Sequence, residues 1–168
     1  MTSHSSNALN AGTGGHTREH GTAGHDTLEA TVRPRSRARA GVSNAVINVS
    51  NLRLRTFIGF NPDEKVKRQD VVVNIEIGYA LDKGVFEDRV EAALDYKSIT
   101  KDVIEHVENG RFLLLEKLVA DVLDICTSHP SVEHARVRIE KPHALRFADS
   151  VSLTLEFDAG ETDIVRER

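Results

Sequence analysis

The chain has 168 residues, of which 39% are hydrophobic and 29% are charged, and its formal net charge is -4 at pH 7. This length suits one modest hydrophobic core and excludes two full domains, and the negative charge excludes the overall basic character of a nucleic-acid-binding protein. No apolar run approaches membrane-spanning length, and the first 20 residues lack the basic start and apolar core of a secretory signal, so we expect a cytoplasmic protein with no membrane contact.

The composition changes sharply near Gly41. Before this point Ser, Thr, Gly, Ala and His dominate, and large apolar side chains are almost absent. Residues 1–41 are therefore predicted to form a disordered tail, whose scattered histidines match no tetrahedral metal spacing. A short basic cluster at 33–39 has the charge to touch phosphates or an acidic surface, although a solvated tail is the favoured interpretation. The polar residues 159–168 are predicted to be a second tail.

Residues 45–158 have the pattern of a folded α+β domain that begins with two strands. Apolar and polar residues alternate over 46–58 and again over 70–81. This two-residue period is typical of half-buried strands. We expect the two strands to form a hairpin, joined by the polar connection 59–69.

Two helices are predicted next. Over 97–108 the apolar residues recur at helical spacing, with Asp95 as the N-cap and an Asn-Gly pair as the stop. A wider apolar stripe follows over 115–126. Cys126, the single cysteine of the chain, lies on this stripe and is interpreted as a buried structural thiol rather than a nucleophile.

Two further strands, 132–141 and 150–157, complete the order strand, strand, helix, helix, strand, strand. This order favours an antiparallel four-stranded sheet with both helices on one face, because the helical pair bridges two hairpins and no parallel crossover is required. Strands of about ten residues with open edges favour pairing with other subunits into a larger ring. A pocket between subunits is the expected consequence.

Four side chains near element boundaries suit proton-transfer chemistry on a polar heterocycle: Glu64, Tyr96, Glu116 and Lys141. Residue chemistry alone leaves a simpler alternative open for each of them. For Glu64 the alternative is a solvated loop carboxylate, and for Tyr96 it is an amphipathic side chain that covers the start of a helix. For Glu116 it is a favourable charge at a helix N-terminus, and for Lys141 an exposed lysine at a strand end.

Several separated motifs strengthen the functional interpretation because they occur in a recognisable order. They are residues 51–59, Glu64, residues 68–69, residues 94–96, residues 114–118 and the pair Lys141-Pro142. On these motifs, residues 46–157 resemble the dihydroneopterin aldolase family. The segments 111–118 and 143–152 resemble its epimerase branch more closely than its aldolase branch, although the Lys141-Pro142 pair also occurs in aldolase-like sequences.

The resemblance implies a tunnelling fold (T-fold), in which subunits pair sheet edges into a barrel. It implies a homo-octamer of two stacked tetramer rings with active sites between neighbouring subunits. It also implies inversion of C2' of 7,8-dihydroneopterin triphosphate to give 7,8-dihydromonapterin triphosphate in pteridine metabolism, by retro-aldol and aldol steps. The alternative is an aldolase that releases glycolaldehyde and 6-hydroxymethyl-7,8-dihydropterin for folate biosynthesis.

The resemblance implies three catalytic residues. Lys141 would shuttle a proton between the 2'-hydroxyl and ring N5, Tyr96 of a neighbouring subunit would relay a proton to the enol carbon, and Glu64 would lie near the side-chain hydroxyls. Because the pterin ring itself is the electron sink, neither a Schiff base nor a metal or other cofactor is required.

Substrate binding is implied for six further residues. Glu116 would accept hydrogen bonds from the pterin 2-amino group and N3. The other five, most of them through backbone groups, are Leu115, Asp95, Leu94, Phe60 and Arg146. The cations considered for the triphosphate are Arg55, Lys67, Arg68 and Arg146, and Arg146 lies within the epimerase-like segment 143–152.

Two other kinds of protein were considered. A non-catalytic pterin-binding or assembly subunit would be favoured if Lys141 and Tyr96 were inert. A zinc-dependent pterin enzyme of the same fold is disfavoured because the histidines of the domain show no close ligand pairing. These histidines are His106, His129, His134 and His143.

Overall fold

The computed structural model describes Arg39 and residues 41–160. Most of the predicted N-terminal tail, 1–38 and 40, lies outside the described residues, and so does 161–168 of the predicted C-terminal tail.

The four long strands and two long helices follow one another along the described chain in the predicted order, with short elements between them. In chain order, the elements are β1 (Asn44–Ile58), α2 (Pro62–Val66), β2 (Gln69–Ala80), the 3-10 turns η1 (Lys83–Glu87) and η2 (Val90–Ala92), α3 (Tyr96–Asn109), β3 (Arg111–Phe112), α4 (Leu115–Cys126), β4 (Val132–Pro142) and β5 (Ser150–Asp158). The four long strands and both long helices are confirmed close to their predicted bounds. The connection predicted as a plain polar loop contains the short helix α2.

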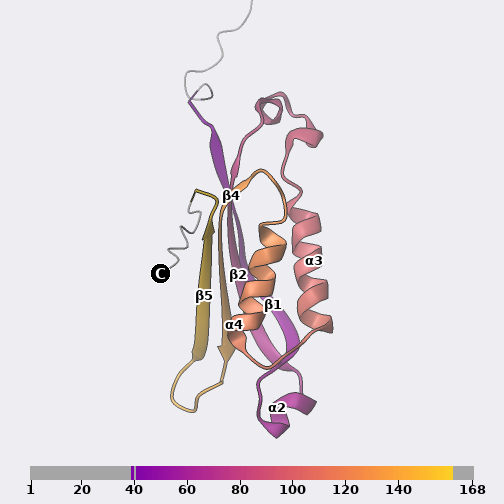
Figure 1. Ribbon diagram of the computed structural model, residues 1–168, viewed down its shortest axis with the longest axis vertical. Coiled ribbons are helices and arrows are strands. Elements are labelled where there is room, and N and C mark those ends of the chain that lie inside the picture. The colour runs from indigo at the N-terminus through magenta and orange to yellow at the C-terminus, as the bar shows by residue number, and fades with distance from the viewer. Residues whose placement is uncertain (1–38, 40, 161–168) are drawn as a thin grey trace, which may run out of the picture. The chain divides into compact units, whose positions relative to one another are not determined.

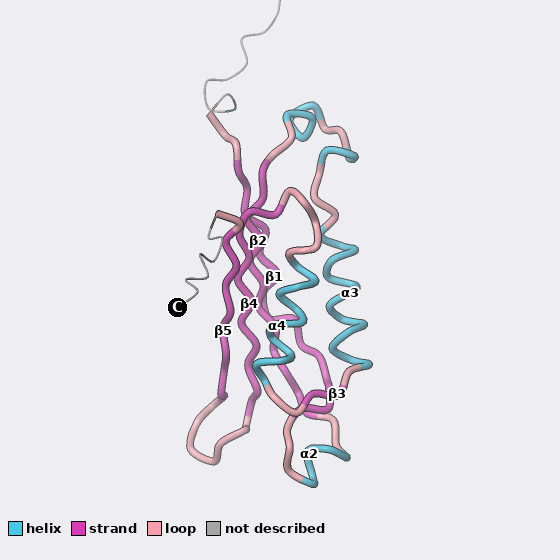
Figure 2. The backbone as a smooth tube through the Cα atoms, viewed as in Figure 1, coloured by secondary structure: helices cyan, strands magenta, loops and turns pink. Residues whose placement is uncertain are grey.

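The sheet has five strands in the order β3-β1-β2-β4-β5, so the prediction of four strands is wrong. The long strands pair antiparallel, as predicted, whereas the extra strand β3 pairs with β1 in parallel through Phe57 with Arg111 and Ile58 with Phe112. A strand of two residues has no alternation for a sequence pattern to reveal. Figure 2 shows β3 at the end of the sheet where α2 also lies.

A β-bulge in β1 keeps both halves of this long strand facing the core. Val49 lies opposite Ile75 and Leu52 opposite Val73, so the register shifts between Val49 and Leu52. Asn51 takes the left-handed backbone conformation, with φ of 56°, which asparagine tolerates better than most residues. Its backbone N–H donates to Oδ1 of Asn74 over 2.9 Å.

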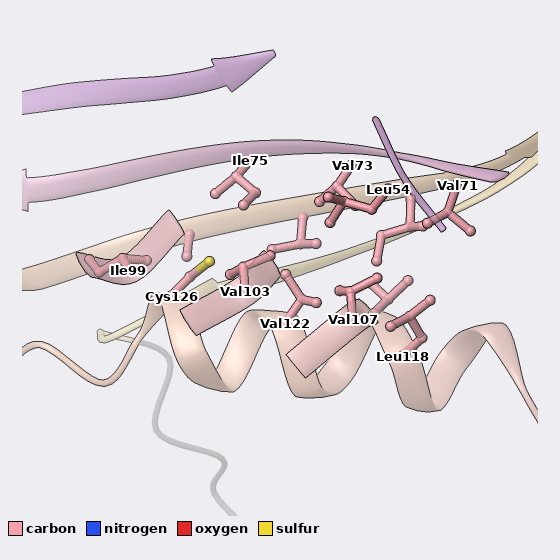
Figure 3. Packing of buried hydrophobic residues seen from close by; sticks show 14 of the residues in the cluster. Leu54, Val71, Val73, Ile75, Ile99, Val103, Val107, Leu118, Val122 and Cys126 are labelled. Atoms are coloured by element: carbon pink, nitrogen blue, oxygen red, sulfur yellow. The ribbon is translucent and has the colours of Figure 1, made fainter. Parts of the chain in front are cut away.

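Helices α3 and α4 cover one face of the sheet, as predicted (Figure 1). Side chains from the sheet and from both helices meet in one apolar layer, which Figure 3 shows from close by. The polar tie between the two helices is Asp121 of α4, whose Oδ2 lies 3.1 Å from Nε2 of His106 on α3. Cys126 is fully buried in the core, which confirms its predicted burial, and burial raises the pKa of its thiol to about 12.

Within the described ranges, no helix combines the length and apolar character needed to cross a membrane.

Candidate active site

Lys141, near the end of β4, forms an ion pair with Glu64 of α2, where its Nζ donates to Oε1. Only 13% of the lysine side chain and 21% of the glutamate side chain are exposed. The same Nζ donates to the backbone carbonyl of Ile58 over 3.2 Å. Two residues separated by most of the domain are thus held together at one end of the sheet.

The turn between β1 and α2 sets the position of Glu64. Gly59 adopts φ of +126°, a conformation that favours glycine, and its N–H donates to the carbonyl of Phe112 over 3.0 Å. Pro62 begins α2, and the backbone N–H of Asn61 donates to Oε2 of Glu64 over 3.1 Å. Each Glu64 carboxylate oxygen therefore has its own donor.

Electrostatics keep Glu64 ionised. The hydrogen bond from Lys141 is the largest influence and lowers the pKa of Glu64 below its ordinary value, while partial burial acts in the opposite direction. At neutral pH this carboxylate is an acceptor and not a proton donor.

The carbonyl of Ile58 is a shared acceptor at the base of this pair. It accepts from Nζ of Lys141 and from Nε2 of Gln69, the first residue of β2. Because these donors come from different strands, the end of β1 is tied to both β4 and β2 beside the ion pair.

Glu116 lies in the first turn of α4, directly after β3, and its side chain is exposed. Figure 1 places the start of α4 at the end of the sheet where α2 lies. Among the described residues, no cation lies close enough to Glu116 to form an ion pair. Leu115 precedes it on the helix, and Phe60, which follows Gly59, is 66% exposed at this same end. These predicted residues share one end of the domain with the ion pair.

Tyr96 does not join them within one chain. It begins α3, whose 14 residues span about 21 Å, and it is the far end of this helix that leads into β3. Tyr96 instead lines a groove of about 580 Å³ between α3 and β1, with Ile47 and Ile104 among the apolar residues of the lining. Leu94 before it is buried in the core, and Asp95 caps α3 by accepting from the N–H of Ser98 over 3.0 Å.

Arg146 lies in the loop that follows Lys141 and connects β4 to β5. The loop closes through the N–H of His143, which donates to the carbonyl of Asp149 over 3.1 Å. The guanidinium carbon of Arg146 lies 5.5 Å from the ring centroid of Phe147, a side chain that is 94% exposed.

A cavity of about 250 Å³ beside Glu64 contains residues that the sequence did not mark as part of the site. It is lined by Phe57, Gly59, Glu64, Lys65, Arg111, Phe112 and Leu113. The signal for Gly59 was present, because a glycine between a strand and a polar connection is typical of a turn with positive φ. Arg111 lies in the epimerase-like segment 111–118, but no pattern assigned it to the site, since the strand that positions it has only two residues.

The arrangement suits reversible proton transfer to and from a substrate hydroxyl, with an ammonium and a carboxylate in contact and a second carboxylate at the same end of the sheet. In the part of the chain described here, no three His, Cys, Asp or Glu side chains gather into a potential metal site. Fold and site together define an α+β domain with a candidate acid–base site at one end of its sheet.

Comparison with known proteins gives the family. The protein-family model described as "FolB: Dihydroneopterin aldolase" matches residues 47–156 of the sequence. The chain therefore belongs to the dihydroneopterin aldolase family. Dihydroneopterin triphosphate 2'-epimerase of Escherichia coli K12 is 53% identical over 113 residues, which cover 67% of this chain and 94% of that protein. The protein of the same name from Pseudomonas aeruginosa is 49% identical over 111 residues, which cover 66% of this chain and 90% of that one.

Aldolases are more distant. Dihydroneopterin aldolase of Escherichia coli K12 is 28% identical over 111 residues, which cover 66% of this chain and 91% of that protein. The crystal structure of an E. coli dihydroneopterin aldolase in complex with neopterin superposes with a TM-score of 0.61 at 29% identity, and covers 67% of this chain and 98% of that one. The T-fold predicted from the sequence is confirmed for the single chain, and its assembly into a barrel stays a prediction.

Proposed function

We propose that this chain is an epimerase that converts 7,8-dihydroneopterin triphosphate into 7,8-dihydromonapterin triphosphate by inverting C2'. The observation that carries the proposal is the ion pair between Lys141 and Glu64, which places a proton donor and a proton acceptor side by side at the end of the sheet. The higher identity to epimerases than to aldolases supports this choice between two related reactions.

The reaction needs one proton to move in each direction. As the 2'-hydroxyl loses its proton, the C1'–C2' bond breaks, and its electron pair passes through C6 to N5, which gains a proton. Lys141 gives its proton to N5 and takes up the proton of the hydroxyl, while ionised Glu64 accepts a hydrogen bond from the substrate and keeps the lysine in place. The aldehyde then turns its other face to the enamine, and the same transfers in reverse re-form the bond with C2' inverted.

The remaining predicted residues have proposed roles in binding. Glu116 accepts two hydrogen bonds from the pterin 2-amino group and N3, with the backbone groups of Leu115 and Phe60 beside it. Arg146 is a candidate for contact with the terminal phosphate, because its loop directly follows Lys141.

Tyr96 acts in the site of a neighbouring chain, together with the backbone of Leu94 and Asp95. This proposal is supported by the length of α3, which separates Tyr96 from the ion pair within one chain. It requires an oligomer, and a homo-octamer of two stacked tetramer rings is the proposed assembly. The cytoplasm is the proposed compartment, since a highly charged triphosphate does not cross a bilayer unaided.

The aldolase is the second proposed activity, because it begins with the same bond cleavage. If the aldehyde leaves before it recombines, the products are 6-hydroxymethyl-7,8-dihydropterin and the released aldehyde. Retention of the aldehyde therefore decides between the two reactions.

Lys141→Ala tests the proposal against a non-catalytic pterin-binding subunit. We expect monapterin formation to fall by about 10²- to 10⁴-fold, the usual effect of losing a general acid or base, while neopterin still binds. Lys83→Ala, an exposed lysine in η1, is the matched control and should have unchanged turnover. Turnover that survives in Lys141→Ala would remove the proposed role of this lysine.

A further inference from the structure

We propose that the cavity between α2 and β3 is the subsite for the triphosphate of the substrate, and that Lys65 and Arg111 bind its phosphate groups. This inference rests on the proposed function. It assigns the main phosphate contacts to a part of the molecule different from the loop of Arg146, and leaves to Arg146 only a contact with the terminal phosphate.

The first support is position. The cavity includes the side chain of Glu64, the residue proposed to contact the substrate hydroxyls. In dihydroneopterin triphosphate the phosphate chain is attached at C3', the carbon next to the reacting C2'. A substrate whose 2'-hydroxyl lies at Glu64 must therefore place its first phosphate within a few bonds of this residue, and the cations that share a cavity with Glu64 are Lys65 and Arg111.

The second support is unbalanced charge. Of the described residues, no carboxylate lies within 4.0 Å of the charged groups of Lys65, Arg68 or Arg111. Four other arginines of the domain do have such partners: Arg55 with Asp70, Arg89 with Asp82 and Glu87, Arg136 with Glu156, and Arg138 with Glu140. The carboxylate in the cavity wall, Glu64, is already paired with Lys141. The cavity therefore carries excess positive charge, which favours an anion.

The third support is the fixed orientation of Arg111. Its guanidinium carbon lies 3.9 Å from the ring centroid of Phe57, and its Nη1 donates to the backbone carbonyl of Lys65 over 3.3 Å. The guanidinium carbon of Arg68 lies 5.5 Å from the same ring centroid. Stacking on an aromatic ring sets the plane of a guanidinium and leaves its other N–H groups for bidentate contact with phosphate.

The size of the cavity fits a part of the substrate and not the whole. Its volume is about 250 Å³. Sites that bury a complete drug-sized ligand usually have about 300–1,000 Å³. A subsite for the phosphate chain, with the pterin ring bound outside it near Glu116, agrees with this volume.

Such a subsite also explains how the aldehyde would be retained. Cleavage of the C1'–C2' bond leaves C2' and C3' on the aldehyde fragment, and this fragment carries the triphosphate. Cations that hold the triphosphate keep the aldehyde next to the enamine while it turns. The subsite would then favour epimerisation over release.

Equilibrium binding tests the inference without depending on turnover. The probes are neopterin triphosphate and neopterin, measured by titration calorimetry with wild type, Arg111→Gln, Lys65→Gln and the control Arg136→Gln, which changes an arginine paired with Glu156. We expect wild type and control to prefer the triphosphate, and each cavity variant to lose about tenfold or more of this preference, with neopterin affinity changed far less. Equal loss for both probes, or an unchanged preference in both cavity variants, would overturn the inference.

Product partitioning is the second readout. With dihydroneopterin triphosphate as substrate, Arg111→Gln should raise the ratio of 6-hydroxymethyldihydropterin to monapterin, and Arg146→Gln should raise it less. A larger change in Arg146→Gln would move the subsite to the loop after β4. If wild type forms neither product but the binding preference depends on Lys65 and Arg111, the proposed function fails while the anion subsite stands.

Discussion

Gly59 and Glu64 approach so closely that a Cβ atom added to Gly59 would lie 2.1 Å from Oε2 of Glu64. The absence of a side chain at Gly59 is what allows the glutamate to reach across the turn and meet Lys141. The backbone of Gly59 has φ of +126°, where an L side chain is strained as well.

Gly59→Ala is therefore expected to displace Glu64 and to break its contact with Lys141. Turnover should fall by about tenfold or more, and the strained backbone should lower the free energy of unfolding by roughly 1–3 kcal/mol. Gly160→Ala is the matched control, because a Cβ atom there meets nothing within 4 Å. Measurement of kcat and of urea unfolding checks both effects, and wild-type values in Gly59→Ala would show that the turn adapts without cost.

The Lys141–Glu64 pair predicts a specific dependence of stability on pH. Because the pKa of Glu64 is lowered in the folded protein, its contribution is complete above the pKa of the unfolded chain and is lost as the pH falls through the folded value. The free energy of unfolding of wild type should exceed that of Glu64→Gln by roughly 1.5 kcal/mol at pH 7. The difference should shrink as the pH falls below about 4.5, near the ordinary pKa of glutamate. Urea unfolding of both proteins at a series of pH values checks this, and a difference that stays constant to pH 3 would contradict it.

Glu116→Gln tests the proposed pterin anchor. The exchange replaces a carboxylate that accepts two hydrogen bonds by an amide that accepts and donates, so affinity for neopterin should fall by about 10- to 100-fold. The melting temperature should change little, since Glu116 is exposed. Asp124→Asn on the same helix is the control. Unchanged neopterin affinity in Glu116→Gln would return this residue to a simple charge at the helix N-terminus.

Mixed oligomers test whether Tyr96 serves a neighbouring chain. Lys141→Ala and Tyr96→Phe should each be nearly inactive, and unfolding and refolding them together should restore up to about a quarter of wild-type activity, because random pairing gives that share of intact sites. Lys141→Ala mixed with Glu64→Gln is the control. These two residues contact within one chain, so this mixture should stay inactive. If the mixture of Lys141→Ala and Tyr96→Phe stayed inactive, Tyr96 would not complete the site of a neighbouring chain.

Much of the fold could be predicted because its long elements repeat one pattern over many residues. The bulge in β1 was not predicted, although the apolar positions change parity between Val49 and Leu52. The short elements β3 and α2 were not predicted, and the reason is physical. Strand β3 and helix α2 have two and five residues, too few for any periodicity, and tertiary contacts hold them in place.

The sequence predicted some residues of the candidate site but not the contacts between them. Sequence motifs marked Lys141 and Glu64, but not that they touch, because 77 positions separate them and the turn at Gly59 decides their approach. Arg111 was missed as a site residue, since its placement over Phe57 depends on the parallel pairing of β3 with β1. Contacts between residues that are far apart in the sequence cannot be predicted from motifs alone and are known only from the folded structure.

The most direct test of the central claim is product identification from the purified protein, without added metal. Dihydroneopterin triphosphate and dihydroneopterin are incubated separately, then oxidised, dephosphorylated and separated by chromatography. Monapterin as the main product from the triphosphate is the predicted result. Predominant 6-hydroxymethylpterin would make the chain an aldolase, and no product from either substrate would contradict the proposed catalysis by Lys141 and Glu64.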